Sequence, residues 1–243
     1  MVSEKAKKLI LDYEGLNQPW KWPGGSSGIT IGIGYDLGYE GGDFADDWSQ
    51  YLSNEQIERL SKAIGVTGEA AREMASQFRD INVNRADSEE VFESKTLPKY
   101  EGMTRHAFSG VDNLPDDAKG ALVSVVFNRG TSMKGDSRLE MRNIRDILVS
   151  LYAGGGTPNE RGLNLALRDI ENEIRSMKRI WVGKGLDGLL KRRDKEADLV
   201  KSCITVDENR VDEDISTVSE ANSSNRVSEI FSKIKSVFDK VRS

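Results

Sequence analysis

The stretch Gly24–Tyr39, GGSSGITIGIGYDLGY, decides which fold the rest of the chain supports. Apolar side chains alternate along it with the period of two that indicates a half-buried β-strand; they are Ile29, Ile31, Ile33 and Tyr35. The opposite face carries Thr30, Gly32, Gly34 and Asp36. Because glycine has no side chain, Gly32 and Gly34 are expected to leave backbone open to a flat, hydroxyl-rich ligand.

A straight strand from Thr30 to Asp36 would span roughly 20 Å, which is too long for the two side chains to share one substrate atom. We therefore expect the chain to fold back at Gly32–Gly34 as a short hairpin. This hairpin would return Asp36 toward Glu14, the acid at the end of the first helix. A hydroxyl and two carboxylates would then surround one cleft.

The remaining signal is almost entirely helical. Residues 3–14 predict a helix with Ser3 as N-cap and Gly15 as its stop. The apolar run 121–127 predicts a central buried helix that ends at Gly130. Other helices are expected after the capping sequences Ser53–Gln56 and Asp87–Glu90, after Pro98 and Pro115, and over 138–152, 162–181 and 187–202, whereas 38–48 reads as a loop. The predicted fold class is α+β, mainly α, with a small β-hairpin lobe and a larger helical lobe.

The chain divides by composition into a domain over 1–203, a polar acidic linker over 204–225 and an amphipathic helix over 226–243. The helix is interpreted first as packing on the domain or self-associating. A helix that binds a partner or a membrane surface is the alternative.

Composition excludes several classes of function. A net charge of −5 argues against a nucleic-acid partner, and one cysteine with one histidine argues against a zinc site or a disulfide framework. No apolar run approaches the roughly 20 residues of a membrane span. Asp12 and Glu14 interrupt any signal-peptide core, so synthesis in the cytoplasm is expected.

The predicted cleft has the chemistry of a glycosidase, which needs one protonated and one ionised carboxyl group. Glu14 is the candidate acid, because a helix C-terminus disfavours its anion and Tyr13, Trp20 and Trp22 would desolvate it. Asp36 would stay ionised, and Thr30 would hold the attacking water. Trp20 also offers an indole face for a sugar ring. The structural alternatives are a solvated Glu14, a Thr30 that only favours the strand, and an Asp36 that bonds its own backbone.

Three blocks in the same order resemble the phage-type lysozymes of glycoside hydrolase family 24. They are the helix ending in Glu14-Gly15 followed by TIGIGY at 30–35, ALVSVVFNRG at 121–130, and GLLKRRDKEA at 188–197. Together they span roughly 3–202. Pro23 stands where many family members carry an acid or a cysteine, and the order Glu14, Thr30, Asp36 is more similar to the pesticin-like muramidases and endolysins.

The resemblance implies a lysozyme-like fold and an inverting muramidase that lyses or kills bacteria. Glu14 would be the general acid, Asp36 the base or stabiliser and Thr30 the water-positioning hydroxyl. Asp43, Asp46 and Asp47 are near in sequence and remain alternatives to Asp36 as the second carboxylate. Asn128 and Arg129 would contact the glycan or its peptide stem, Arg129 being alternatively a helix cap. No cofactor or metal is implied.

The implied partner is peptidoglycan in the periplasm of a host or target bacterium. Delivery by a holin, by a secretion apparatus or as a bacteriocin with an immunity protein stays open. Other functions that remain are a lytic transglycosylase, a non-catalytic wall-binding module, and an interaction protein centred on 226–242.

Overall fold

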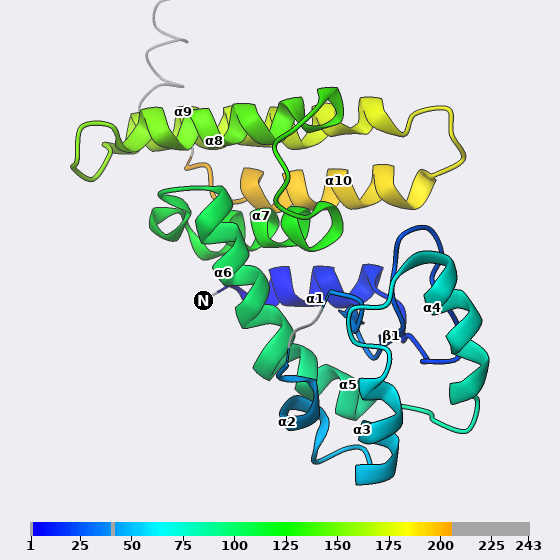
Figure 1. Ribbon diagram of the computed structural model, residues 1–243. Helices are drawn as coiled ribbons and strands as arrows, with labels where there is room; N and C mark the ends of the chain where they lie inside the picture. The colour runs from blue at the N-terminus through cyan, green and yellow to red at the C-terminus, as the bar shows by residue number, and fades with distance from the viewer. Residues whose placement is uncertain (1, 40–41, 206–243) are drawn as a thin grey trace, which may run out of the picture. The chain divides into compact units, whose positions relative to one another are not determined.

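The computed structural model describes residues 2–39 and 42–205 (Figure 1). These residues are mainly helical and contain one two-stranded antiparallel sheet, which confirms the predicted α+β, mainly α, class. Contacts group Met1–Ile204 into one compact unit. The linker predicted beyond residue 205 and the helix predicted over 226–243 lie outside the described residues.

The predicted hairpin is present. β1 (Thr30–Ile31) pairs with β2 (Tyr35–Asp36), with Thr30 opposite Asp36 and Ile31 opposite Tyr35. The chain reverses through Gly32 and Gly34, whose φ angles of +57° and +68° lie in the left-handed region that glycine adopts without strain. The fold-back at these glycines is therefore confirmed.

The hairpin packs into the smaller of two lobes, whose helices are α2 (Phe44–Trp48), α3 (Asn54–Ser61), α4 (Gly68–Ala75) and α5 (Arg85–Val91). A short 3₁₀ turn, η1 (Ser76–Phe78), follows α4. The buried side chains of this lobe include Ile29, Ile31, Tyr35, Leu37, Phe44 and Trp48. Figure 1 shows these elements gathered around β1, at the end of the unit away from α8 and α9.

Two local predictions in this lobe are wrong. The segment 38–48 was expected to be a loop, but α2 forms there because Phe44 and Trp48, one helical turn apart, are both fully buried. The capping sequence at Asp87–Glu90 does not start a helix. Asn84 caps α5 instead, since its side chain accepts a 2.9 Å hydrogen bond from the backbone N–H of Asp87. The capping box at Ser53 is confirmed.

A continuous helical path leads from this lobe to the larger one. α5 passes through a π-helical turn, η2 (Phe92–Thr96), into α6 (Leu97–Ala107). Pro98 lies in the first turn of α6, as predicted. A proline has no backbone N–H to donate to the preceding turn, so the widened turn falls where regular hydrogen bonding is interrupted.

The larger lobe is a stack of long helices, which Figure 1 shows above α1. They are α7 (Asp116–Arg129), α8 (Leu139–Tyr152), α9 (Glu160–Ser176) and α10 (Asp187–Lys201), with 3₁₀ turns η3 (Val111–Asn113), η4 (Asp136–Arg138) and η5 (Met177–Ile180). The predicted helices over 138–152, 162–181 and 187–202 are confirmed within a few residues. α7 is the predicted central helix, because Ala118–Val126 are all buried and Gly130 ends it.

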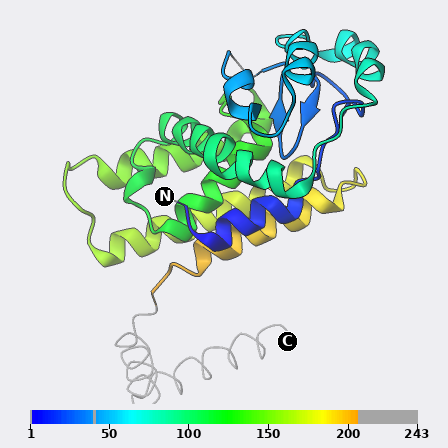
Figure 2. The same cartoon turned by 90° about the horizontal axis from the view of Figure 1, so that it is seen from below.

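The first helix, α1 (Glu4–Tyr13), lies against α7 and α10. Figure 2 shows it running along α10. The Ser3 side chain caps its first turn, as predicted. The approach to α7 is close, because a Cβ added at Gly120 would lie 2.2 Å from the Cβ of Ala6.

A third group of buried side chains joins the two lobes: Ile10, Ile33, Phe92, Leu97 and Val123. Ile33 was expected on the same strand face as Ile29 and Ile31. It lies instead in the turn between β1 and β2, where the alternation of a strand no longer applies, and it packs with Ile10 of α1. The hairpin tip is thus fixed to the first helix by apolar contact.

Candidate functional site

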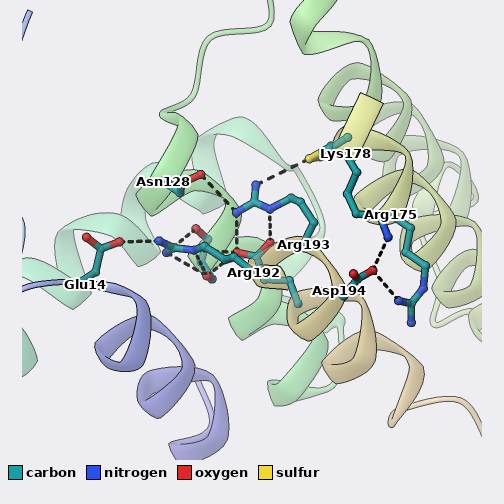
Figure 3. A network of polar contacts seen from close by, with 10 residues as sticks. Glu14, Asn128, Arg175, Lys178, Arg192, Arg193 and Asp194 are labelled. Atoms are coloured by element: carbon teal, nitrogen blue, oxygen red, sulfur yellow. Dashed lines mark hydrogen bonds and ion pairs between the residues drawn. The ribbon is translucent and has the colours of Figure 1, made fainter. Parts of the chain in front are cut away.

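Glu14 is the C-cap of α1, and its backbone N–H donates to the carbonyl of Ile10. Its side chain is 20% exposed, and Oε1 accepts a 2.6 Å hydrogen bond from Nη1 of Arg192 on α10 (Figure 3). Among the described residues, Oε2 has no hydrogen-bond partner. One carboxylate oxygen is therefore held by a guanidinium, and the other is left for a ligand.

Arg192 belongs to a buried ion-pair network. Its Nε lies 3.2 Å from Oε1 of Glu196, and its guanidinium also donates to the hydroxyl and carbonyl oxygens of Ser124 on α7. Glu196 is fully buried and accepts in addition from Arg193 and from the Ser124 hydroxyl, at 2.8 and 2.6 Å. Two guanidinium groups thus face the carboxylates of Glu14 and Glu196, so the network is balanced in charge.

Aromatic rings and an amide complete this network. The Arg192 guanidinium carbon lies 5.8 Å from the centre of the Tyr13 ring, and that of Arg193 lies 5.7 Å from the Trp181 ring. Arg193 also donates to Oδ1 of Asn128 at 3.4 Å. Because Arg192 is held by both Glu196 and Ser124, it presents a rigid donor to Glu14.

The hairpin lies close to Glu14 along the chain. Asn17 exchanges two backbone hydrogen bonds with Gly32 at the hairpin tip, of 2.8 and 2.9 Å. Asn17 lies three positions after Glu14, and three steps along the chain span at most about 10 Å. The loop after α1 therefore ties the candidate acid to the hairpin.

The carboxylate of Asp36 is occupied by backbone. It accepts from the N–H groups of Gly28 and Gly38, at 3.0 and 2.9 Å, at the hairpin base. The hydrogen bond from Gly38 matches the structural alternative given above for Asp36. In that alternative the carboxylate accepts from the backbone N–H two residues later in the chain. Burial raises the pKa of Asp36, although these N–H groups and the nearby Lys99 act in the opposite direction.

Thr30 lies directly opposite Asp36 and is buried. Its hydroxyl donates to the carbonyl of Gly28 at 3.4 Å. The structure therefore brings Thr30 and Asp36 together, and it brings Glu14 together with the arginine network. Within residues 2–39 and 42–205, no hydrogen bond or ion pair links one group to the other, so a shared cleft stays a prediction.

The prediction of open backbone is wrong for Gly32, which is buried, whereas Gly34 is partly exposed. A Cβ at Gly32 would lie 2.8 Å from the Trp48 ring, and one at Gly34 would lie 2.5 Å from the Phe127 ring. Both glycines are therefore needed for the turn and for close packing against α2 and α7. Ligand contact at Gly34 stays a prediction.

Neither tryptophan of the predicted aromatic loop bonds to Glu14. The Trp20 indole is 40% exposed and donates to Asn82, while Trp22 packs in the smaller lobe and donates to the carbonyl of Ser27. The Tyr13 ring contacts the network through Arg192, and the Trp181 ring does so through Arg193. Trp20 remains a candidate sugar platform because part of its ring is accessible.

Arg129, at the end of α7, does not cap its own helix. It donates to the carbonyl of Ser137, and its guanidinium carbon lies 4.8 Å from the centre of the Trp181 ring. Burial, with the neighbouring guanidinium groups of Arg138 and Arg193, lowers the pKa of Arg129 to about 10. Asn128 is exposed and bonded to Arg193, so both predicted contact residues border the network around Glu14.

The surface of the described residues includes two recesses to which Glu14 can be compared. The larger, about 790 Å³, lies between α8 and α9, and the other, about 400 Å³, is bordered by Tyr35, Asp47 and Lys95 beside the hairpin. Glu14 lines neither. The described part of the chain holds no group of three or more side chains suited to a metal ion, and none of its helices has the length and apolarity of a membrane span.

The residues that sequence reasoning left without a role are Ser124, Arg192, Arg193 and Glu196. A usable signal was present, because Arg192 and Glu196 are four positions apart on a predicted helix and two arginines share that turn. Comparison with protein-family models and with curated proteins finds no match for this chain.

Proposed function

We propose that this protein is a peptidoglycan hydrolase that cleaves the β-1,4 bond between N-acetylmuramic acid and N-acetylglucosamine. One observation carries the proposal: Glu14 ends α1 beside the hairpin, with Oε1 held by Arg192 and Oε2 without a protein partner among the described residues. A general acid needs this combination of fixed orientation and one oxygen directed at substrate. The resemblance of three ordered sequence blocks to phage-type lysozymes supports the same reaction.

In the proposed reaction, Oε2 of Glu14 carries the proton that passes to the leaving glycosidic oxygen. Asp36 acts as base or electrostatic stabiliser, and the Thr30 hydroxyl positions the attacking water. Inversion at the anomeric carbon requires the two carboxyl groups to be about 6.5–9.5 Å apart in the substrate complex. Trp20, Asn128 and Arg129 are the proposed substrate contacts.

The buried network supports this role for Glu14 through its rigidity. Arg192 is 2% exposed and Glu196 is completely buried, and a Ser124 hydroxyl bonds both. A donor fixed in this way keeps the Glu14 carboxyl group in one orientation, and such positioning contributes to catalysis by removing unproductive geometries. An acid on a free surface helix would have no comparable support.

Clearing of chloroform-treated Gram-negative cells tests the proposal directly. Wild-type protein is expected to lower turbidity, and Glu14→Gln to abolish this because an amide has no acidic proton to transfer. Asp12→Asn, at an exposed position two residues earlier that pairs with Lys8, is the matched control and should retain activity. Wild-type protein that sediments with walls but clears nothing would contradict the hydrolase and indicate a binding module.

A lytic transglycosylase is the second candidate, and the environment of Asp36 favours it. This carboxylate is engaged by Gly28 and Gly38, which leaves Glu14 as the one acid free to act in the pair. Asp36→Asn keeps an Oδ1 acceptor for both N–H groups while removing the charge. Mass spectrometry of digested sacculi separates the two reactions: 1,6-anhydro ends from an active Asp36→Asn protein indicate a transglycosylase, and reducing ends lost in this variant indicate a hydrolase.

A further inference from the structure

The loop between α7 and α8 gathers positive charge without matching carboxylates. Arg129, Arg138 and Arg142 all form hydrogen bonds there, but their acceptors are the carbonyl of Ser137, the sulfur of Met141 and the carbonyls of Met133 and Gly135. None of the three guanidinium groups has an ion-pair partner among the described residues. A group of arginines without ion-pair partners is unusual in a protein whose net charge is −5.

Of these three positive charges, that of Arg129 is the least favourable for the stability of the folded protein. Its Nε is buried without a hydrogen-bond partner, and its guanidinium is stacked against Trp181. The nearest carboxylates are already engaged: Glu140 is bonded by Arg179, and Glu196 is bonded by Arg192 and Arg193. A partly buried charge without an ion-pair partner is unfavourable, so an anion bound at this position would be stabilised.

Arg138 adds a second group of the same kind. Burial lowers the pKa of Arg138, and its proximity contributes to the lowered pKa of Arg129. Two neighbouring guanidinium groups that repel each other offer several N–H donors to one oxyanion. Guanidinium geometry fits carboxylate and phosphate oxygens in a bidentate arrangement.

Arg129 is connected to the candidate catalytic network through Trp181. The guanidinium carbons of Arg129 and Arg193 lie 4.8 and 5.7 Å from the centre of the Trp181 ring. Arg193 in turn bonds Glu196, which bonds Arg192, the partner of Glu14. A ligand held by Arg129 would therefore extend from the same region as the glycan.

We propose that Arg129 and Arg138 form a binding site for a carboxylate of the peptide stem that peptidoglycan carries on N-acetylmuramic acid. This inference rests on the proposed function for the identity of the ligand, whereas the oxyanion chemistry rests on the two guanidinium groups alone. The site would give the enzyme a preference for glycan that still carries its stems.

Calorimetric titration tests the site without requiring cleavage. The probes are the disaccharide N-acetylglucosaminyl-N-acetylmuramic acid with a tetrapeptide stem, the same disaccharide without a stem, and inorganic phosphate. This disaccharide lacks the bond that a muramidase cuts, so binding is measured on an intact ligand. Wild-type protein is expected to bind the stem-bearing probe at least about tenfold more tightly than the bare disaccharide.

The double variant Arg129→Gln/Arg138→Gln is expected to lose this tenfold preference and to bind the bare disaccharide as wild type does. Arg168→Gln, which removes an exposed charge on α9, is the matched control and should keep the preference. Thermal melting of the double variant without ligand should be unchanged or higher, since a mutual repulsion has been removed. If the double variant does not fold, Arg138→Gln alone replaces it in the test, since this side chain is partly exposed. The single variant should weaken binding of the stem-bearing probe at least about threefold.

Equal affinity of wild type for both disaccharides, or an equal loss of both in the double variant, would overturn the site. Phosphate that binds more tightly than the stem-bearing probe, in an arginine-dependent manner, would overturn its assignment to a carboxylate. Arginine-dependent stem binding by a protein that releases no fragments from walls would contradict the hydrolase and leave this site standing. Cleavage of walls without a stem preference would contradict this site alone.

Discussion

Arg192 on α10 donates a 2.6 Å hydrogen bond to Glu14 at the end of α1, across 178 positions of sequence. The same guanidinium bonds Glu196 from its other side, so that one buried cation lies between two carboxylates. The position of Glu14 therefore depends on the packing of the first and the last described helices against each other. Four predictions follow from this arrangement and from the hairpin beside it.

Replacing Glu196 with Gln should lower the free energy of unfolding by about 3–5 kcal/mol, because Arg192 and Arg193 would be left buried with too little negative charge. Urea unfolding followed by circular dichroism measures the change. Glu58→Gln, at an exposed position on α3, is the control and should stay within about 0.5 kcal/mol of wild type. A Glu196→Gln protein as stable as wild type would show that the network does not support the fold.

Arg192→Lys should reduce wall lysis about 10- to 100-fold if Glu14 is the acid. A lysine keeps the charge but cannot bond Glu14, Ser124 and Glu196 at once with a planar fork, so the carboxyl group loses its fixed orientation. The effect should fall on kcat more than on KM, because orientation matters most in the transition state. Adding Arg192→Lys to the inactive Glu14→Gln protein should leave binding to walls unchanged. Full lysis by Arg192→Lys would refute the positioning role.

Gly34→Ala should destabilise the protein by more than about 1 kcal/mol. Its φ angle of +68° is strained for alanine, and the new Cβ would lie 2.5 Å from the Phe127 ring. Gly102→Ala is the opposite control, since this glycine lies inside α6 with nothing within 4 Å of its added Cβ, and it should gain about 0.5–1 kcal/mol. Thermal or urea unfolding measures both. Similar effects at the two positions would mean that Phe127 does not restrict the hairpin.

Asp36 should make stability depend on pH in a defined direction. Burial raises the pKa of Asp36 in the folded protein, so the folded state binds this proton more tightly than the unfolded state does. The resulting stabilisation is complete below the unfolded pKa of about 3.9 and is lost as pH rises through the higher folded value. The free energy of unfolding of wild type, relative to Asp36→Asn, should therefore fall as the pH rises above about 4.

Chemical unfolding at several pH values measures this difference, and a fixed offset between the two proteins does not affect its slope. A relative stability that rises over the same range would mean that the backbone N–H bonds from Gly28 and Gly38 outweigh burial. That result would favour an Asp36 that stays ionised, as the proposed base requires.

The long helices were predictable because their signals are local. Ser3 caps α1, nine consecutive residues of α7 are buried, and Gly130 ends that helix, each as the residue pattern indicates. Local signals fail when an element is short or when two residues compete for one role. α2 has only five residues, too few for a helical period to show, and Asn84 rather than Asp87 caps α5 although both side chains are able to.

The candidate site was predictable only in part. The sequence identified Glu14 at a helix end and a hairpin pairing Thr30 with Asp36, and the structure has both. It assigned Gly32 and Gly34 to ligand contact, whereas Gly32 is buried and an added Cβ at either position would meet Trp48 or Phe127. Whether a bare glycine faces solvent or a neighbouring ring depends on residues far away in the chain, which no local pattern reveals.

By itself the sequence determined the fold class, the main helices and the reversal at the glycines, because hydrophobic period, capping residues and positive φ act over a few neighbouring residues. Only the tertiary structure decided that Glu14 is held by Arg192, that Glu196 balances two arginines, and that Arg129 and Arg138 have no described counter-ion. These outcomes depend on which charges meet when separate helices pack. Which ion pairs form between helices is decided by how the apolar faces pack over the whole unit. The spacing of the charged residues along the chain does not decide it.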